Sequence, residues 1–279
     1  MEVGISFNDI KSYTDNMSKG LDDKLFFLNR INFKADRSYV FVDFGCADGV
    51  LISALYGILK ERGVRACYIG YDISDEMINL AKAKCDVDKY TTMFTTDWSD
   101  VEEKIKKFDE SVLILSSVVH EVYSYANVDN DDIGVFWHRV RSTGFDYICV
   151  RDMMCSQDIN RPKKDFSSIF KYSIKMSFLN EELKDFENKW GSIENNKNFV
   201  HFLLKYRWQI NWEREVNENY FPLYIDEFME RFNEKYNVSY FERFRVPYLD
   251  KCIKEDFGIE LDDYTHIKAV FEIKKVKEG

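Results

Sequence analysis

Residues 39–49 read YVFVDFGCADG, an apolar run that passes into a turn with two glycines. The run at 39–44 is short, β-branched and aromatic, which predicts a buried strand. Residues 50–62 follow with apolar side chains at helical spacing, and Gly63 is a suitable stop for that helix. Glycines between a strand and a helix let the backbone approach a ligand at the carboxyl edge of a parallel sheet. We therefore expect a ligand site where this first strand ends.

The alternation of strand and helix continues to residue 151. Further strands are predicted at 66–71, 91–95, 111–116 and 147–151, and helices at 75–84, 101–108 and 133–141. Ser74 is a candidate N-cap for the helix that follows it. Strands that alternate with helices imply a parallel sheet built from right-handed crossovers.

The pattern changes after residue 151, which predicts an insertion that is largely helical and rich in aromatic residues, Lys and Glu. Two last strands are predicted at 239–246 and 266–274, joined by a loop, and an apolar helix face at 23–31. We predict an α/β fold: a Rossmann-like, mostly parallel seven-stranded sheet with helices on both faces and a helical lid. The parts are an N-terminal helical cap at 1–38, a core at 39–151 and 238–279, and the lid at 152–237.

The composition is that of an ordinary globular chain, because 45% of the 279 residues are hydrophobic and 32% are charged. No apolar run approaches the roughly 20 residues that span a bilayer, and the N-terminus lacks a basic region followed by an apolar stretch. We expect a cytoplasmic protein without a membrane partner, while the oligomeric state stays open. The 6 cysteines form no C-x-x-C pair, and the 4 histidines do not join them at zinc-finger spacing. We therefore expect buried thiols and no metal.

The formal net charge of -10 disfavours a broad nucleic-acid surface, since neutralising phosphates supplies most non-specific affinity. Two common phosphate-binding motifs also do not fit the turn. A nicotinamide fingerprint that starts at Gly45 would need glycines where Ala47 and Val50 stand, and no G-K-[ST] follows for a Walker loop. The charge favours a small molecule or a protein as the substrate, and the turn fits neither of these two phosphate-binding motifs.

The turn resembles the first motif of class I S-adenosylmethionine-dependent methyltransferases, in which alternating glycines follow an acid. Here the motif stands as Asp43, Gly45, Ala47 and Gly49, so that Ala47 adds a methyl group beside the methionine portion of the cofactor. The resemblance covers roughly residues 39–151 through the order and spacing of its motifs, and the chain as a whole looks like a microbial branch of this family. It implies S-adenosyl-L-methionine as the cofactor.

Two further motifs of the family follow. Asp72, at the end of the second strand, fits the acid that accepts both ribose hydroxyls, and Asp97 with Trp98 fits the acid and the aromatic ring at the adenine. The residues expected at the cofactor are Asp43, Gly45, Cys46, Ala47, Gly49, Asp72, Ile73, Asp97, Trp98 and Ser116. Simpler interpretations stay open, because the glycines could form only a tight turn and the acids could be strand-end caps or loop residues.

After the fourth strand comes SSVVHEVYSY at 116–125, where this family places residues that face the acceptor. His120 is the leading candidate for a base because its ordinary pKa is near 6.5, and Glu121 and Tyr123 are further candidates. His120 could equally be a hydrogen-bonded structural residue under the lid. Arg151, after the fifth strand, could clamp a carboxylate or phosphate, or could simply pair with Asp152.

The predicted lid contains a dense polar and aromatic run at 198–221. His201, Tyr206, Arg207 and Trp212 are expected to shape the acceptor pocket, although the same side chains could instead form an aromatic face that packs on the sheet.

The leading hypothesis is an enzyme that transfers a methyl group to O or N of a small-molecule acceptor. RNA is the alternative acceptor, because residues 118–125 have a short likeness to cap guanine-N7 methyltransferases and because five basic residues lie close together: Arg161, Lys163, Lys164, Lys171 and Lys175. A third possibility is an inactive, cofactor-binding partner subunit. Surface charge alone would equally explain the basic run.

Overall fold

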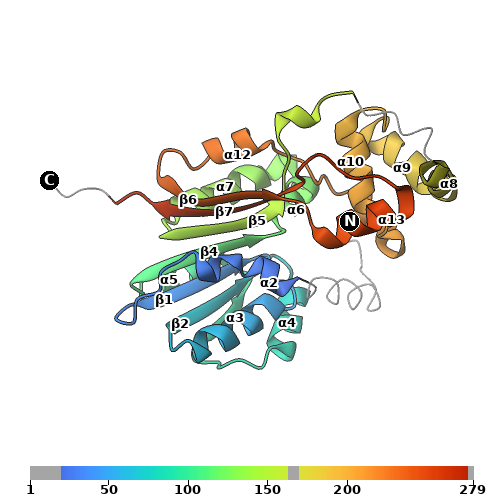
Figure 1. Ribbon diagram of the computed structural model, residues 1–279. Coiled ribbons are helices and arrows are strands. Elements are labelled where there is room, and N and C mark those ends of the chain that lie inside the picture. Colours follow the sequence, from blue (N-terminus) through green and yellow to red (C-terminus); the bar gives the residue numbers. More distant parts are fainter. Residues whose placement is uncertain (1–19, 163–169, 276–279) are drawn as a thin grey trace.

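The computed structural model describes residues 20–162 and 170–275. Its centre is a seven-stranded sheet in the order β3-β2-β1-β4-β5-β7-β6, with helices on both sides (Figure 1). The strands are β1 (Ser38–Phe44), β2 (Arg65–Tyr71), β3 (Thr92–Thr95), β4 (Glu110–Ser116), β5 (Tyr147–Met153), β6 (Tyr236–Phe244) and β7 (His266–Ile273). The strands β1 to β5 pair in parallel, whereas β7 is antiparallel to β5 and to β6. The predicted mostly parallel seven-stranded sheet is therefore confirmed.

One face of the sheet is covered by α3 (Val50–Glu61) and α4 (Asp75–Lys84), together with the segment before β1. The buried side of α3 consists of Leu51, Ile52, Leu55 and Leu59, which matches the predicted helical spacing. Ser74 caps α4 as predicted, because its hydroxyl accepts a hydrogen bond from the Met77 N–H at 3.3 Å. The local sequence thus accounts for both helices on this face.

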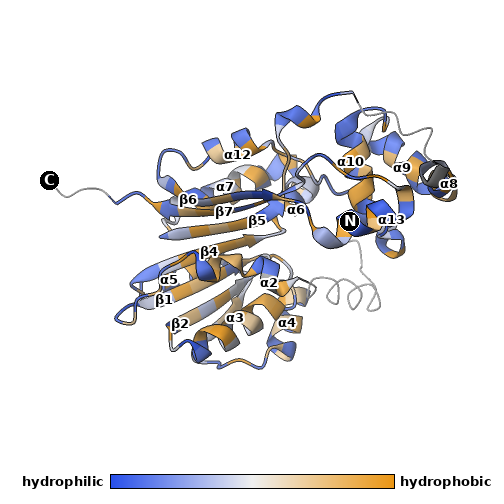
Figure 2. Cartoon of the chain, in the orientation of Figure 1, coloured by the Kyte–Doolittle hydropathy of each residue, from blue (hydrophilic) through white to orange (hydrophobic). Residues whose placement is uncertain are grey.

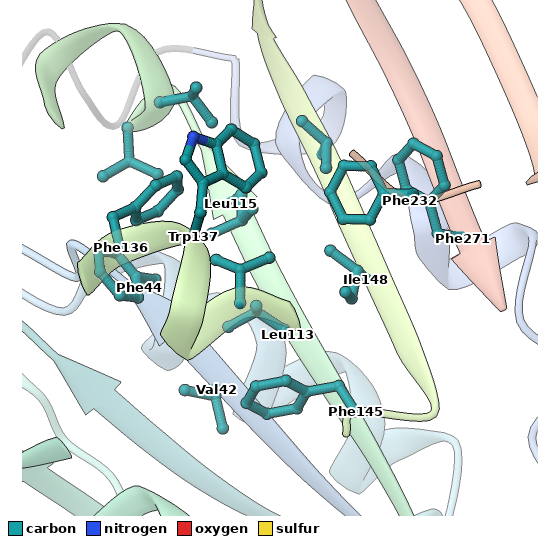
Figure 3. Packing of buried hydrophobic residues seen from close by; sticks show 14 of the residues in the cluster. Val42, Phe44, Leu113, Leu115, Phe136, Trp137, Phe145, Ile148, Phe232 and Phe271 are labelled. Atoms are coloured by element: carbon teal, nitrogen blue, oxygen red, sulfur yellow. The ribbon is translucent and has the colours of Figure 1, made fainter. Parts of the chain in front are cut away.

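The other face is covered by α5 (Trp98–Ile105), α7 (Asp132–Ser142) and α12 (Ile225–Glu230), and the chain between β4 and α7 forms α6 (Val119–Tyr125). Figure 3 shows Phe136 and Trp137 of α7 packed over Leu113 and Leu115 of β4, with Phe232 against Phe271 of β7. Figure 2 shows the same layering as apolar strands between helices whose outer sides are hydrophilic. The sheet therefore holds its carboxyl edge rigidly in place.

A separate helical unit lies beside the sheet, at the end where α6 is found (Figure 1). It contains α8 (Phe170–Phe178), α9 (Asn180–Trp190), α10 (Asn196–Lys205), α11 (Trp212–Glu215) and α13 (Pro247–Phe257). These helices share their own apolar core with Cys155 and Ile159. This helical unit is called the lid below, and most of its helices lie within 152–237. α12 packs in the sheet layer through Phe228, whereas α13, which lies after 237, packs in the lid through Phe257.

Three local predictions were wrong. The expected helix at 23–31 is instead a short α2 (Leu21–Lys24) followed by a 3-10 turn at Phe26–Asn29; the rest of the predicted cap, residues 1–19, lies outside the described residues. The expected loop between the last two strands contains α13, which starts at Pro247 and ends before the left-handed Gly258. The helix expected at 101–108 begins at Trp98, since Asp97 caps it. In the part of the chain that the structure describes, no helix has the length and apolar character required to cross a membrane.

Candidate functional site at the carboxyl edge of the sheet

The turn between β1 and α3 is tied to the neighbouring strand by its backbone. The N–H groups of Gly45 and Cys46 both donate to the carbonyl oxygen of Tyr71, at 2.7 and 3.0 Å. Gly45 has φ 75°, and a Cβ atom there would lie 2.7 Å from the Cγ2 atom of Val118 in the chain after β4. The ends of β1, β2 and β4 therefore meet at one point, as the parallel topology predicts.

Asp72 bridges this turn and the start of α4. Its Oδ2 atom accepts a hydrogen bond from the N–H of Ala47 at 3.0 Å, and its Oδ1 atom accepts one from the N–H of Ser74 at 3.0 Å. Burial raises the pKa of Asp72, and the backbone N–H groups of Ser74, Ala47 and Ile73 oppose that rise. Each carboxylate oxygen retains a second lone pair, so Asp72 can still accept from two ligand hydroxyls.

Acidic groups gather beside the turn. Asp43 and Asp48 are 4% and 5% exposed, and the ammonium group of Lys84 pairs with Asp48 at 2.9 Å. Burial raises the pKa of Asp43 to about 7, while the charge of Lys24 lowers it and that of Asp72 raises it. Burial and the nearby Arg151 in turn lower the pKa of Lys24, and Asp43 acts against that change. A group that brings a positive charge would be stabilised at this edge.

Several features fit a cofactor with a polar tail and a cationic centre. The hydroxyl oxygen of Ser116, at the end of β4, is buried and has no hydrogen-bond partner within residues 20–162 and 170–275. Gly49 has φ 75°, and a Cβ atom there would lie 2.5 Å from the sulfur of Cys85. Ala47 also has a positive φ, of 45°. Residues with a side chain rarely adopt this backbone conformation, so the shape of the turn must hold Ala47 in it. The residues present therefore fit S-adenosylmethionine.

At the far end of this edge, the predicted adenine residues differ in accessibility. Ile73 is 81% exposed, and Asp97 is an exposed N-cap whose carboxylate accepts from the N–H of Ser99 at 2.9 Å. Trp98 is 6% exposed, with its ring centroid 5.5 Å from Phe44 and 5.0 Å from Tyr71. Its indole ring is therefore part of the core, and Ile73 offers the larger apolar surface to a ligand. Cys46 is also buried, which raises the pKa of its thiol.

On the acceptor side, His120 lies between two carboxylates. Its Nδ1 atom is 2.7 Å from Oδ1 of Asp152, and its Nε2 atom is 3.8 Å from Oε2 of Glu218. Burial lowers the pKa of His120, but Asp152, Glu121 and Glu218 together outweigh burial, so the net pKa is raised above 6.5. A buried histidine whose two ring nitrogens both face carboxylates is poorly placed to take a proton from an acceptor, which favours the structural interpretation of His120.

The other predicted catalytic residues have partners of their own. Glu121 pairs with Arg214 of the lid at 3.0 Å, and the hydroxyl oxygen of Tyr123 accepts from the indole N–H of Trp137 at 2.9 Å. Arg151 does not pair with Asp152. Its guanidinium group instead binds Asp23 at 2.9 Å and the Ser117 hydroxyl at 3.0 Å, because Asp152 points to the opposite side of the strand, toward α6. Arg151 thus holds the segment before β1 across the sheet edge.

The four predicted lid residues are engaged within the helical unit. The Tyr206 hydroxyl and the Arg207 guanidinium both donate to Asp256 of α13, and the Trp212 indole donates to Asp185 of α9. His201 is 3% exposed, with its Nε2 atom 3.3 Å from the Tyr220 backbone nitrogen. None of these four interactions reaches α6. The contacts between lid and α6 come instead from the segment 214–220, which includes the partners described next.

Sequence reasoning missed the residues that join the sheet to the lid. Glu218 is 4% exposed and accepts from Arg214 at 2.8 Å and from the hydroxyl of Tyr125 at 3.1 Å. The Asn219 N–H donates to the hydroxyl of Ser124 at 2.7 Å. The i,i+4 spacing of Arg214 and Glu218 was a visible signal of an ion pair, but nothing local indicated that both would face α6. Asp152 could have been suspected from its place at the end of a strand.

Comparisons with known proteins agree with this geometry. A family model described as a methyltransferase domain matches residues 15–203. No curated protein sequence matches the chain.

Among solved structures, the chain is similar to an S-adenosylmethionine-dependent methyltransferase from Mesorhizobium loti, with 13% identity, 91% of this chain and 100% of that chain covered, and a TM-score of 0.48. It is also similar to the plantazolicin methyltransferase BamL, solved with a triazolic desmethylPZN analog and SAH, with 14% identity, coverage of 97% and 90%, and a TM-score of 0.44. A third similar structure is a complex from Haloferax volcanii between the Trm112 methyltransferase activator and a methyltransferase. The identity is 14%, 98% of this chain and 100% of that chain are covered, and the TM-score is 0.46.

The family model covers well over half of the chain, and the sheet order and the glycine turn are those expected of the fold. The chain therefore belongs to the methyltransferase-domain family and is a class I S-adenosylmethionine-dependent methyltransferase.

Proposed function

We propose that the enzyme transfers the methyl group to an oxygen or nitrogen atom of a small molecule, held where α6 meets the lid. The observation that carries this proposal is a partly exposed carboxylate, that of Glu121, at this junction. Glu121 and Glu218 face it with Arg214 between them, and the side chains of Glu121 and Arg214 are 29% and 27% exposed. The partly exposed carboxylate of Glu121 can accept a hydrogen bond from the hydroxyl or amine of a small acceptor, and it offers no positive charge to attract a phosphate backbone.

The cofactor supplies a methyl group on a positively charged sulfur, and the chain has to align that group with the acceptor atom. We propose that Asp72 accepts from the ribose hydroxyls, that Asp97 accepts from the adenine amino group while Ile73 covers the ring, and that the turn at 45–49 with the Ser116 hydroxyl binds the methionine portion. Asp43 and Asp48 stabilise the positive charge. A base is required only if the acceptor has a proton to lose.

Of the four predicted catalytic residues, we assign contact with the acceptor to Glu121. The other three act through neighbours, since His120 bridges Asp152 and Glu218, Tyr123 holds Trp137, and Arg151 holds Asp23. The partly exposed carboxylate of Glu121 can orient an acceptor hydroxyl or amine by accepting its hydrogen.

RNA is the less favoured acceptor because the described members of the basic run are already paired. Arg161 forms a bidentate ion pair with Asp263 at 2.7 and 2.8 Å, and the ammonium group of Lys175 lies 3.7 Å from Asp256. Lys163, Lys164 and the side chain of Lys171 lie outside the described residues. Cations that are paired with carboxylates contribute little to binding phosphates.

The test uses S-adenosylmethionine with a labelled methyl group and a native cell extract divided into a small-molecule filtrate and an RNA fraction. We expect label to appear only in the filtrate and only with active enzyme. Label confined to RNA would favour the alternative acceptor. Labelling of neither fraction, together with no calorimetric binding of S-adenosylhomocysteine, would contradict the cofactor assignment itself.

A further inference from the structure

Asp152 forms four hydrogen bonds although it is completely buried. Its Oδ2 atom accepts from the N–H groups of Val118 and Val119 at 3.0 and 2.7 Å. Its Oδ1 atom accepts from the N–H of Met153 at 2.7 Å and lies 2.7 Å from Nδ1 of His120. These contacts use the acceptor capacity of both oxygens, so Asp152 acts through the groups that it holds.

The first group that Asp152 holds is the chain between β4 and α6. Ser117 has a left-handed backbone with φ 57°, and its N–H donates to the carbonyl oxygen of Arg151 at 2.7 Å. The N-cap residue of α6, Val118, has no side chain that can cap the helix, so the carboxylate of Asp152 supplies the cap from the neighbouring strand. The turn that follows Ser116 therefore depends on a residue of β5.

The second group is the imidazole ring of His120. Glu121 acts on it from α6, and Glu218 and Tyr220 approach from the lid, with the Tyr220 ring centroid at 5.5 Å. The pKa of two further histidines, His201 of α10 and His266 of β7, is affected by burial first and also by the nearby His120. Burial holds the pKa of both well below 6.5, so they are neutral and do not compete for the positive charge.

The imidazole ring of His120 is therefore one link between two parts of the molecule. Asp152 belongs to the sheet, whereas Glu218 belongs to the segment that joins the lid to α6 through Tyr125 and Arg214. A neutral imidazole would leave the buried carboxylate of Glu218 with a weaker partner at 3.8 Å.

We propose that Asp152 is a positioning residue for methyl transfer: it fixes the turn 117–120 and holds the imidazole ring of His120, so that His120 helps to join the lid to the sheet through Glu218. The proposal rests on the proposed function only in taking the junction of α6 and the lid as the acceptor side. Asp152 is completely buried, so it positions the segment 117–120 without contact with cofactor or acceptor.

The test compares Asp152→Asn with Asp146→Asn in the full chain. Asp146 is a matched control because its carboxylate also accepts from a neighbouring strand, from the N–H and hydroxyl of Ser111 at 2.7 and 2.9 Å, but lies at the opposite end of β5. The readouts are the titration of His120 by NMR, with a His120→Asn variant for assignment, and hydrogen exchange of the Val118 and Val119 amides.

We expect His120 to titrate above 6.5 in the wild-type protein and at or below that value in Asp152→Asn. Exchange at Val118 and Val119 should be at least about tenfold faster in Asp152→Asn, because the buried N–H groups lose a charged acceptor. Asp146→Asn should change neither readout. An unchanged His120 titration in a folded Asp152→Asn protein would overturn the proposal.

A second variant covers the case in which Asp152→Asn does not fold. Glu218→Gln leaves Asp152 in place, and we expect it to lower the pKa of His120 and to speed exchange in the segment 214–221 while Val118 and Val119 stay protected. If exchange in 214–221 is unaffected, His120 does not join the lid to the sheet. Calorimetry with S-adenosylhomocysteine on the wild-type protein tests the proposed function separately, because its failure would leave the NMR result intact.

Discussion

Asp72 accepts hydrogen bonds from the N–H groups of Ala47 and Ser74 and can still accept from ligand hydroxyls, which makes its role measurable. We expect Asp72→Ala to weaken S-adenosylhomocysteine binding by about 2–3 kcal/mol, because the ribose hydroxyls lose a charged acceptor. Isothermal calorimetry measures this change. Asp97→Ala is the matched control at the same edge: it removes an exposed acid and should have the smaller effect. Equal affinities for the wild-type protein and Asp72→Ala would contradict the ribose assignment.

Asp43 gives the cofactor site a dependence on pH. Burial raises its pKa to about 7, so we expect Asp43 to change its protonation state near neutral pH. A cationic ligand favours the carboxylate, and binding should release protons. Affinity for S-adenosylmethionine is therefore expected to rise about tenfold between about pH 6 and about pH 8. Calorimetry in buffers of different ionisation enthalpy measures the proton release, and Asp43→Asn should abolish both effects.

The sequence predicted residues whose roles depend on neighbours in the chain, and it did not predict residues whose partners are distant in the chain. Asp43, Gly45 and Asp72 were predicted because each stands at a fixed position of a strand-to-helix turn. Asp152 and Glu218 were not, since their roles depend on contacts with residues far away in the sequence, as the pairs Asp152–Val119 and Glu218–His120 show. A carboxylate at the end of a strand is a common feature, and only the folded chain shows what it binds.

At the scale of elements, the turn that starts α3 should tolerate no side chain at Gly49. A Cβ atom there would lie 2.5 Å from the sulfur of Cys85, on a backbone with φ 75°. We expect Gly49→Ala to lower the free energy of unfolding by about 1–3 kcal/mol. Gly57 lies in the helix that follows, and a Cβ atom added to it would have no other atom within 4 Å, so Gly57→Ala should stabilise by about 0.5–1 kcal/mol. Urea unfolding measures the stability of both variants. A Gly49→Ala protein more stable than Gly57→Ala would contradict the prediction.

The elements were predicted best where a strand is buried on both faces. β1, β2, β4 and β5 read as continuous apolar runs, and their predicted positions agree with the structure. β6 lies at the sheet edge with mostly exposed side chains, so its sequence lacks such a run and its start at Tyr236 was missed. The helix α13 was missed although Pro247 and Gly258 are typical start and stop residues and the buried Cys252, Ile253 and Phe257 stand at helical spacing.

At the scale of the whole molecule, Asp23 connects the segment before β1 to the middle of the sheet. Its carboxylate pairs with Arg151 of β5 at 2.9 Å and with Lys268 of β7, whose side chains are 13% and 14% exposed. We expect Asp23→Asn to lower the free energy of unfolding by about 1–3 kcal/mol, because two cations lose their shared acceptor. Glu103→Gln, which breaks an exposed pair with Lys107, is the control and should change little. Similar effects of both variants in urea unfolding would argue against a special role for Asp23.

His120 should make the stability of the whole fold depend on pH. Its pKa in the folded state is raised above 6.5, so its stabilising contribution is fully present below that value and is lost as pH rises through the raised pKa. We expect the difference in unfolding free energy between wild-type protein and His120→Asn to shrink from about pH 6 to about pH 9. A difference that stays constant across this range would show that the charge of His120 does not stabilise the fold.

The chain order of the sheet determines when the fold can be completed. β7 lies between β5 and β6, yet it is the last of the seven strands to leave the ribosome, after all the lid helices. During synthesis, β5 exposes an unpaired edge until the register Arg151↔Lys268 can form. The nascent chain must therefore avoid self-association through this apolar edge after the rest of the sheet has been synthesised. A chain that ends before β7 would leave the edge of β5 unpaired permanently.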